Sequence, residues 1–107
     1  MISLSNYLDD LFGTVSAVQV TDDSGQPVGV DDALVKVINC LHQVRDSRAK
    51  NIFIGNGGSA AIASHMAIDY SKNGRLPSLA FNDGPALTCL GNDLGYENVF
   101  AEQIKLH

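Results

Sequence analysis

Two residues in the middle of the chain have the types and the spacing to do chemistry together. His65 and Asp69 are four positions apart, so on a helix both side chains lie on one face, one turn apart. An imidazole and a carboxylate in this arrangement can bind one metal ion or act as an acid and base pair. The same spacing also suits an ordinary surface pair that stabilises a helix by about a few tenths of a kcal/mol. The spacing alone leaves both interpretations open.

A glycine-rich turn precedes this pair and indicates where a ligand could bind. The apolar run over residues 52–54 predicts a buried strand, and the glycines of residues 55–58 can take backbone angles closed to other residues. Ser59 is a suitable N-cap for a helix from residue 60 to about residue 73. Unpaired amides and the positive end of the helix dipole meet at this turn, which predicts a site for an anion or a polar sugar.

Two amphipathic helices are predicted ahead of this unit. The first covers residues 1–20, where apolar side chains recur at close to helical spacing. The second begins at Asp31 or Asp32, either of which can act as its cap, and reaches residue 50. Residues 21–30 are rich in turn formers and predict a surface connector. Both apolar stripes need a partner, and the pattern allows that partner to be the same subunit or another one.

A strand, a helix and a second strand at residues 78–81 predict a parallel crossover. Both edges of such a two-stranded sheet are open, so we expect another copy or further strands to cover them. Pro85 should lie in the first turn of a short helix over residues 86–90, with residues 91–93 in the loop after it. A last amphipathic helix is predicted over residues 96–106. Because loops after parallel strands gather at one edge, the loop after the second strand and the glycine turn should face one crevice.

Length and composition limit the chain to a small domain with few general partners. A chain of 107 residues that is 45% hydrophobic allows one domain with a core of modest size. The net charge of −5, without any block of like charges, argues against general binding to nucleic acid or to anionic membranes. Cys40 and Cys89 show no C-x-x-C spacing, and no secretory signal opens the chain. We therefore expect a reduced, cytoplasmic protein.

The motifs together resemble a known family. The residues that carry the resemblance are Gly55-Asn56-Gly57-Gly58-Ser59, the pair His65 and Asp69, and Gly91-Asn92-Asp93-Leu94-Gly95-Tyr96. Over roughly residues 35–104 they are similar to the sugar isomerase (SIS) domain and, within it, to the phosphoheptose isomerases. The resemblance implies an α/β fold, the N-terminal half of a SIS-type parallel-sheet sandwich preceded by two amphipathic helices. Residues 1–107 would form a single partial domain, with a helical region over 1–50 and the start of the parallel core over 51–107.

The resemblance also implies an activity. It is that of an aldose-ketose isomerase that interconverts sedoheptulose 7-phosphate and D-glycero-D-manno-heptose 7-phosphate through an enediol. This is an early step toward the heptose of bacterial lipopolysaccharide or capsule. Such enzymes act on a phosphorylated sugar as cytoplasmic homotetramers, typically with zinc.

The resemblance assigns roles to particular residues of this chain. The substrate-binding residues would be Asn56, Gly57, Gly58, Ser59, Asn92 and Asp93. His65 and Asp69 match the first two zinc ligands and would be the catalytic residues. The family usually has Glu at the second ligand position, where it is also the catalytic base. Asp69 is one methylene shorter, which moves the base by roughly an ångström or more and puts the rate in doubt.

Other parts of the family pattern are missing from these residues. Family members continue with a Ser/Thr-rich phosphate loop, and later with a Gln and a His that complete the metal site. Two protein ligands are fewer than the three that catalytic zinc sites keep. We therefore interpret the chain as the first half of an isomerase domain, whose activity alone is doubtful. The alternative is a non-catalytic SIS module that binds a phosphosugar or a protein such as the replication initiator, and the carboxylate at Asp69 favours the enzyme.

Overall fold

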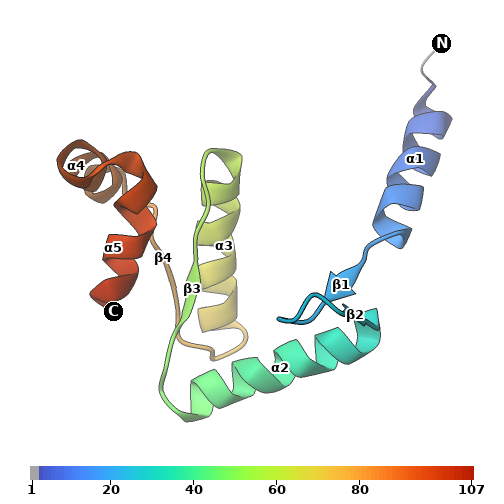
Figure 1. Cartoon of the computed structure of the whole chain (residues 1–107), viewed down its shortest axis with the longest axis horizontal. Coiled ribbons are helices and arrows are strands. Elements are labelled where there is room, and N and C mark those ends of the chain that lie inside the picture. The colour runs from blue at the N-terminus through green and yellow to red at the C-terminus, as the bar shows by residue number, and fades with distance from the viewer. Residues whose placement is uncertain (1–2) are drawn as a thin grey trace. The chain divides into compact units, whose positions relative to one another are not determined.

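The structure is a computed structural model that describes residues 3–107. It divides into two compact units, residues 1–39 and 40–107, and each is described by itself. Figure 1 labels the helices and strands along the chain. None of the helices within residues 3–107 combines the length and the apolar character needed to cross a membrane.

The first unit contains one complete helix, a short hairpin and the start of a second helix. These elements are α1 (Leu4–Ser16), β1 (Val20–Thr21), β2 (Pro27–Val28) and α2 (Val30–Asp46). Ser3 caps α1, since its hydroxyl accepts a hydrogen bond from the Asn6 N–H at 3.2 Å. The predicted helix over residues 1–20 is confirmed from Leu4 but ends at Ser16, and residues 1 and 2 lie outside the described part. No residue of α1 is buried.

The connector between the two helices is a hairpin, which the sequence did not predict. β1 and β2 pair antiparallel, with Val20 opposite Val28. The Asp22 carboxylate organises the turn by accepting hydrogen bonds from the Ser24 hydroxyl at 2.7 Å and from the N–H groups of Ser24 and Gln26, each at 2.9 Å. These hydrogen bonds, first that of the Ser24 side chain and then that of the Gln26 N–H, lower the pKa of Asp22. Strands of two residues are too short for an alternating pattern to reveal them.

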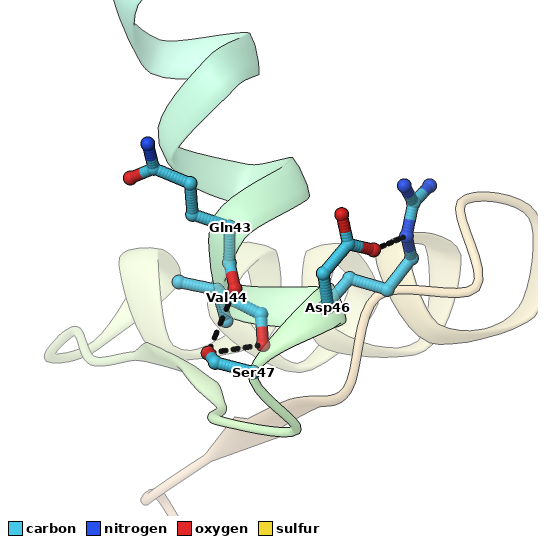
Figure 2. Close-up of polar contacts among 5 residues, drawn as sticks. Gln43, Val44, Asp46 and Ser47 are labelled. Carbon is cyan, nitrogen blue, oxygen red and sulfur yellow. Dashed lines mark hydrogen bonds and ion pairs between the residues drawn. The ribbon is translucent and has the colours of Figure 1, made fainter.

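Helix α2 ends at Asp46, so the prediction that it reaches residue 50 is wrong. Figure 2 shows the Ser47 hydroxyl at the last turn, where it donates to the Gln43 carbonyl at 2.7 Å and to the Val44 carbonyl at 3.2 Å. Arg48 then adopts a left-handed conformation with φ of 57°, and the Ala49 N–H donates back to the Val44 carbonyl. This is the C-cap that glycine usually supplies. With arginine in that place, the sequence contained no stop signal.

The second unit is built on a parallel strand pair joined by a helix. Its first elements are β3 (Asn51–Phe53), α3 (Gly58–Lys72) and β4 (Ser78–Ala80). Asn51 pairs with Ser78 and Phe53 with Ala80, so the predicted parallel crossover and the α/β fold class are confirmed. Helix α3 packs on both strands (Figure 1). It does so through Ala63 and Ala67, whose small side chains are buried and allow the helix to approach the sheet closely.

The rest of the second unit is helical and completes its core. Its elements are α4 (Gly84–Leu94), the 3-10 helix η1 (Tyr96–Asn98) and α5 (Val99–Lys105). Asp83 caps α4 through the Ala86 N–H at 3.0 Å, and Pro85 lies in the first turn as predicted. α4 packs against η1 and α5. The buried apolar residues of the described chain all belong to the second unit: Ala63, Ala67, Leu76, Phe81 and Val99.

Candidate functional site

The glycine turn lies directly after β3, and its backbone requires glycine at two places. Gly57 has φ of 56° and ψ of −127°, a conformation closed to other residues, and it occupies the N-cap position of α3. A Cβ at Gly55 would lie 2.7 Å from the backbone carbon and oxygen of Ser59. The prediction that Ser59 is the N-cap is wrong, because the helix begins one residue before it. Gly57 takes the capping position without a side-chain hydrogen bond.

The amide groups of this turn are partly paired. The Ser59 N–H donates to the Asn56 carbonyl at 3.0 Å, and the Ala60 N–H donates to the Gly57 carbonyl at 3.1 Å. The N–H groups of Gly57 and Gly58 make no hydrogen bond within residues 3–107. They are donors at the positive end of α3, the arrangement that accommodates an anion or a sugar oxygen.

His65 and Asp69 lie together on α3, as their spacing predicts. His65 Nε2 and Asp69 Oδ2 are 3.2 Å apart, and the side chains are 71% and 33% exposed. The other oxygen, Asp69 Oδ1, accepts from Asn73 Nδ2 at 3.5 Å. An exposed pair of this kind stabilises the helix little. Because both groups are open to solvent, they are accessible to a proton or a ligand.

Asn92 and Asp93 are in contact with each other, but the prediction that they lie in a loop is wrong. They belong to the last turn of α4, which continues to Leu94. Asn92 Nδ2 donates to Asp93 Oδ1 at 2.9 Å, and the Cys89 thiol donates to Asp93 Oδ2 at 3.6 Å. The i, i+4 spacing of Cys89 and Asp93 is helical, so the two turns of α4 are linked on one face.

Two polar side chains, Tyr96 and Asn82, join the glycine turn and α3 to later parts of the chain, and neither role was predicted. The Tyr96 hydroxyl donates to Asn56 Oδ1 at 2.6 Å. Asn82, directly after β4, donates through Nδ2 to the Ala60 carbonyl at 2.6 Å and to the Ser64 hydroxyl at 2.8 Å. Pairs 18 to 40 positions apart leave no periodic signal in the sequence. The only available hint was that Asn82 follows a predicted strand and Tyr96 follows Gly95.

The structure also contains an open groove between α3 and β4. Its volume is about 410 Å³, and it is lined by Ser64, Ala67, Ile68, Ser71, Ser78, Ala80, Asn82 and Asp83. None of the predicted site residues lines this groove. The candidate site is therefore the glycine turn with the exposed His65 and Asp69, where unpaired donors and titratable groups are present.

The residues present supply only part of a zinc centre. Imidazole and carboxylate are suitable zinc ligands. Within residues 3–107, however, no group of three or more His, Cys, Asp or Glu side chains could hold a metal ion. His65 and Asp69 alone do not reach the three protein ligands of a catalytic zinc site.

Comparison with known proteins places the chain in a family. No family model matches it. It is 35% identical over 83 residues to the phosphoheptose isomerase of Helicobacter pylori strain ATCC 700392 / 26695, covering 72% of this chain and 43% of the relative. It is 33% identical over 113 residues to phosphoheptose isomerase 2 of Campylobacter jejuni, covering 98% of this chain and 54% of the relative.

A solved structure agrees with these relatives. The phosphoheptose isomerase GmhA from Neisseria gonorrhoeae matches with a TM-score of 0.58 and 36% sequence identity, over 67% of this chain and 39% of that one. The chain thus spans about half or less of the length of these proteins. By sequence and by fold, the chain belongs to the phosphoheptose isomerase family of SIS-fold proteins.

Proposed function

We propose that this chain forms part of an aldose-ketose isomerase that interconverts sedoheptulose 7-phosphate and D-glycero-D-manno-heptose 7-phosphate. The observation that carries the proposal is the position of two sets of groups on one helix. The free N–H groups of Gly57 and Gly58 lie at the start of α3, and the exposed His65 with the half-buried Asp69 follows on the same helix. The first set suits the oxygens of a sugar phosphate, and the second suits proton transfer.

The chemistry requires one proton to move between adjacent carbons. The Asp69 carboxylate would take a proton from C1 of the open-chain ketose while the C2 carbonyl oxygen gains a proton, leaving an enediol between C1 and C2. Return of a proton to C2, and loss of one from the C1 hydroxyl, gives the aldose. His65 touches Asp69 and can exchange protons with the substrate oxygens. The groups proposed to hold the sugar are the amides of residues 57 and 58, with Asn56, Ser59, Asn92 and Asp93.

We propose zinc as the metal of the complete site. His65 Nε2 and one Asp69 oxygen would be two of its ligands, and at least one more must come from outside residues 3–107 or from a second copy. Bound zinc would polarise the substrate carbonyl. A zinc titration tests this directly: the 107 residues alone should bind weakly, and His65→Ala should remove the binding that remains.

We also propose a homotetramer that works in the cytoplasm on the route to surface heptose. The exposed apolar side chains of α1, including Leu4 at 73% and Phe12 at 74%, support assembly because such a stripe gains free energy when it is covered. Sedimentation at several concentrations tests the tetramer.

Isomerisation of sedoheptulose 7-phosphate tests the proposed activity. It should be measured for the 107 residues and for the full-length gene product that contains them, each with and without zinc. In the active form, Asp69→Asn should lower kcat at least 100-fold, because general-base catalysis contributes roughly 10²–10⁴-fold. For the zinc titration with His65→Ala, the matched control is His42→Ala, because His42 is an exposed histidine on α2. An Asp69→Asn variant with unchanged kcat would refute the assigned base.

A second candidate is a non-catalytic module that binds a phosphosugar or a protein. The observation that favours it is the lack of a third metal-binding side chain among residues 3–107. Binding of sedoheptulose 7-phosphate without turnover by the full-length protein, with and without zinc, would favour this module. Turnover in either form would exclude it.

A further inference from the structure

Tyr96 connects the glycine turn to a distant part of the second unit. Its hydroxyl donates to Asn56 Oδ1 at 2.6 Å, across 40 positions of sequence. Asn56 lies in the turn directly after β3, whereas Tyr96 begins η1 after α4. The contact therefore fixes a side chain of the turn from outside the strand and helix that form it.

The Tyr96 ring is itself held in place by its neighbours. A Cβ at Gly91 would lie 3.6 Å from Tyr96 Cδ2 and 3.7 Å from Val99 Cγ1. The ring thus packs next to the bare backbone of Gly91, close to Val99, which is only 1% exposed. Gly95 has φ of 87°, which turns the chain between α4 and η1. One edge of the ring therefore lies against Gly91, and the hydroxyl reaches Asn56 in the turn.

This contact holds the Asn56 amide by one of its two branches. An asparagine amide carries its acceptor oxygen and its donor nitrogen on opposite branches. The oxygen branch is occupied by the Tyr96 hydroxyl, which leaves the nitrogen branch free. Asn56 Nδ2 has no acceptor within residues 3–107. In this arrangement Tyr96 holds the side chain while an N–H donor of Asn56 stays available at the turn.

We propose that Tyr96 is a positioning residue for substrate, acting through Asn56. It orients the amide so that Nδ2 donates to a hydroxyl or carbonyl oxygen of the sugar phosphate. The inference rests on the proposed function, in which Asn56 binds the sugar. It adds a residue that acts on the substrate through Asn56 and not by direct contact.

The test is a double-mutant cycle in the full-length gene product, with sedoheptulose 7-phosphate as the probe. Tyr96→Phe keeps the ring and removes only the hydroxyl, and its Kd should rise about five- to tenfold, as expected for one hydrogen bond. Asn56→Ala should raise Kd at least tenfold, and the double variant should bind no more weakly than Asn56→Ala alone. In turnover, Tyr96→Phe should raise KM and leave kcat within twofold. Tyr7→Phe is the matched control, because Tyr7 and Tyr96 are both 59% exposed.

A second readout does not depend on turnover. The two side-chain amide protons of Asn56 should give separate, well-dispersed NMR signals that move toward free-amide positions in Tyr96→Phe and stay unchanged in Tyr7→Phe. Additive effects in the cycle, or a normal Kd for Tyr96→Phe beside a raised Kd for Asn56→Ala, would overturn the inference and leave the proposed function standing. Absence of sugar phosphate binding by the unsubstituted protein would overturn both.

Discussion

The two units of the chain differ in whether their apolar residues are buried. Residues 40–107 bury Ala63, Ala67, Leu76, Phe81 and Val99, whereas no described residue before position 40 is buried. In the first unit, side chains such as Leu4, Phe12 and Val15 are 63% to 74% exposed. Burial of apolar area is the main source of folding free energy. The second unit can draw on its own core, whereas the described part of the first unit has no buried residue to contribute.

The largest loss of stability should come from adding a side chain at the glycine turn. In Gly55→Ala the new Cβ would meet the Ser59 backbone at 2.7 Å, and backbone cannot move aside as a flexible side chain can. We expect the second unit to lose about 3 kcal/mol of stability, near the upper end for overpacking. Gly58→Ala is the control, because its Cβ would meet nothing within 4 Å. Urea unfolding should separate the two variants, and equal stability would contradict the described geometry.

The next largest loss of stability should come from truncating a side chain of the core. Val99→Ala removes two methyl groups from the most buried side chain and should cost about 2 kcal/mol. Val15→Ala on α1, at 63% exposure, should change the unfolding free energy by less than about 0.5 kcal/mol in the monomer. A comparable loss for Val15→Ala would mean that the first unit has a core of its own. Thermal and urea denaturation of both variants at low protein concentration measure this difference.

A charged residue among the exposed apolar side chains of α1, such as Leu4 and Phe12, should reveal whether copies of the chain pack on this helix. If copies of the chain pack there, Phe12→Glu should raise the dissociation constant of the assembly about tenfold or more, because burial of a phenylalanine contributes about 1.5–3 kcal/mol. Asn6→Glu adds the same charge away from the stripe and should leave assembly unchanged. Sedimentation velocity gives the dissociation constants. Identical values for both variants would exclude α1 as the assembly surface.

The smallest expected change in stability is that of the β1–β2 hairpin, and it depends on pH. The pKa of Asp22 is lowered in the folded chain by the hydrogen bonds from Ser24 and Gln26. A lowered pKa means that the carboxylate adds stability above the ordinary aspartate pKa of about 3.9, and that this stability is lost as the pH falls through the lowered value. The amide shifts of Ser24 and Gln26 should follow this titration. In Asp22→Asn they should not titrate there, and unchanged acid behaviour of that variant would refute the assignment.

The sequence predicted the parts of the second unit that rest on local patterns. The strand, glycine turn and helix around Gly57 follow from short-range composition, and the His65–Asp69 contact follows from helical spacing. The parallel pairing of β3 and β4 follows from element order. These features are predictable because each depends on neighbours along the chain.

Features that depend on particular backbone geometry or on distant contacts were not predictable. The end of α2 uses Arg48 in a conformation that glycine usually adopts. Helix α4 runs through Gly91, although glycine normally indicates a stop, because Gly91 leaves space beside the Tyr96 ring. The Asn56–Tyr96 hydrogen bond spans 40 positions. At Gly91 and at the Asn56–Tyr96 contact, tertiary contacts outweighed the local propensity.

The wide spacing of the Asn56–Tyr96 contact has a consequence for the order of folding. Strands β3 and β4 pair across 27 positions, as in Asn51 with Ser78, and helix α3 already shortens the gap between them. Closing a longer loop costs more chain entropy. We expect the strand pair with α3 to form before the Tyr96 hydroxyl reaches Asn56. In refolding, the pairing of β3 with β4 should therefore be complete before the turn gains the geometry that recognises a ligand.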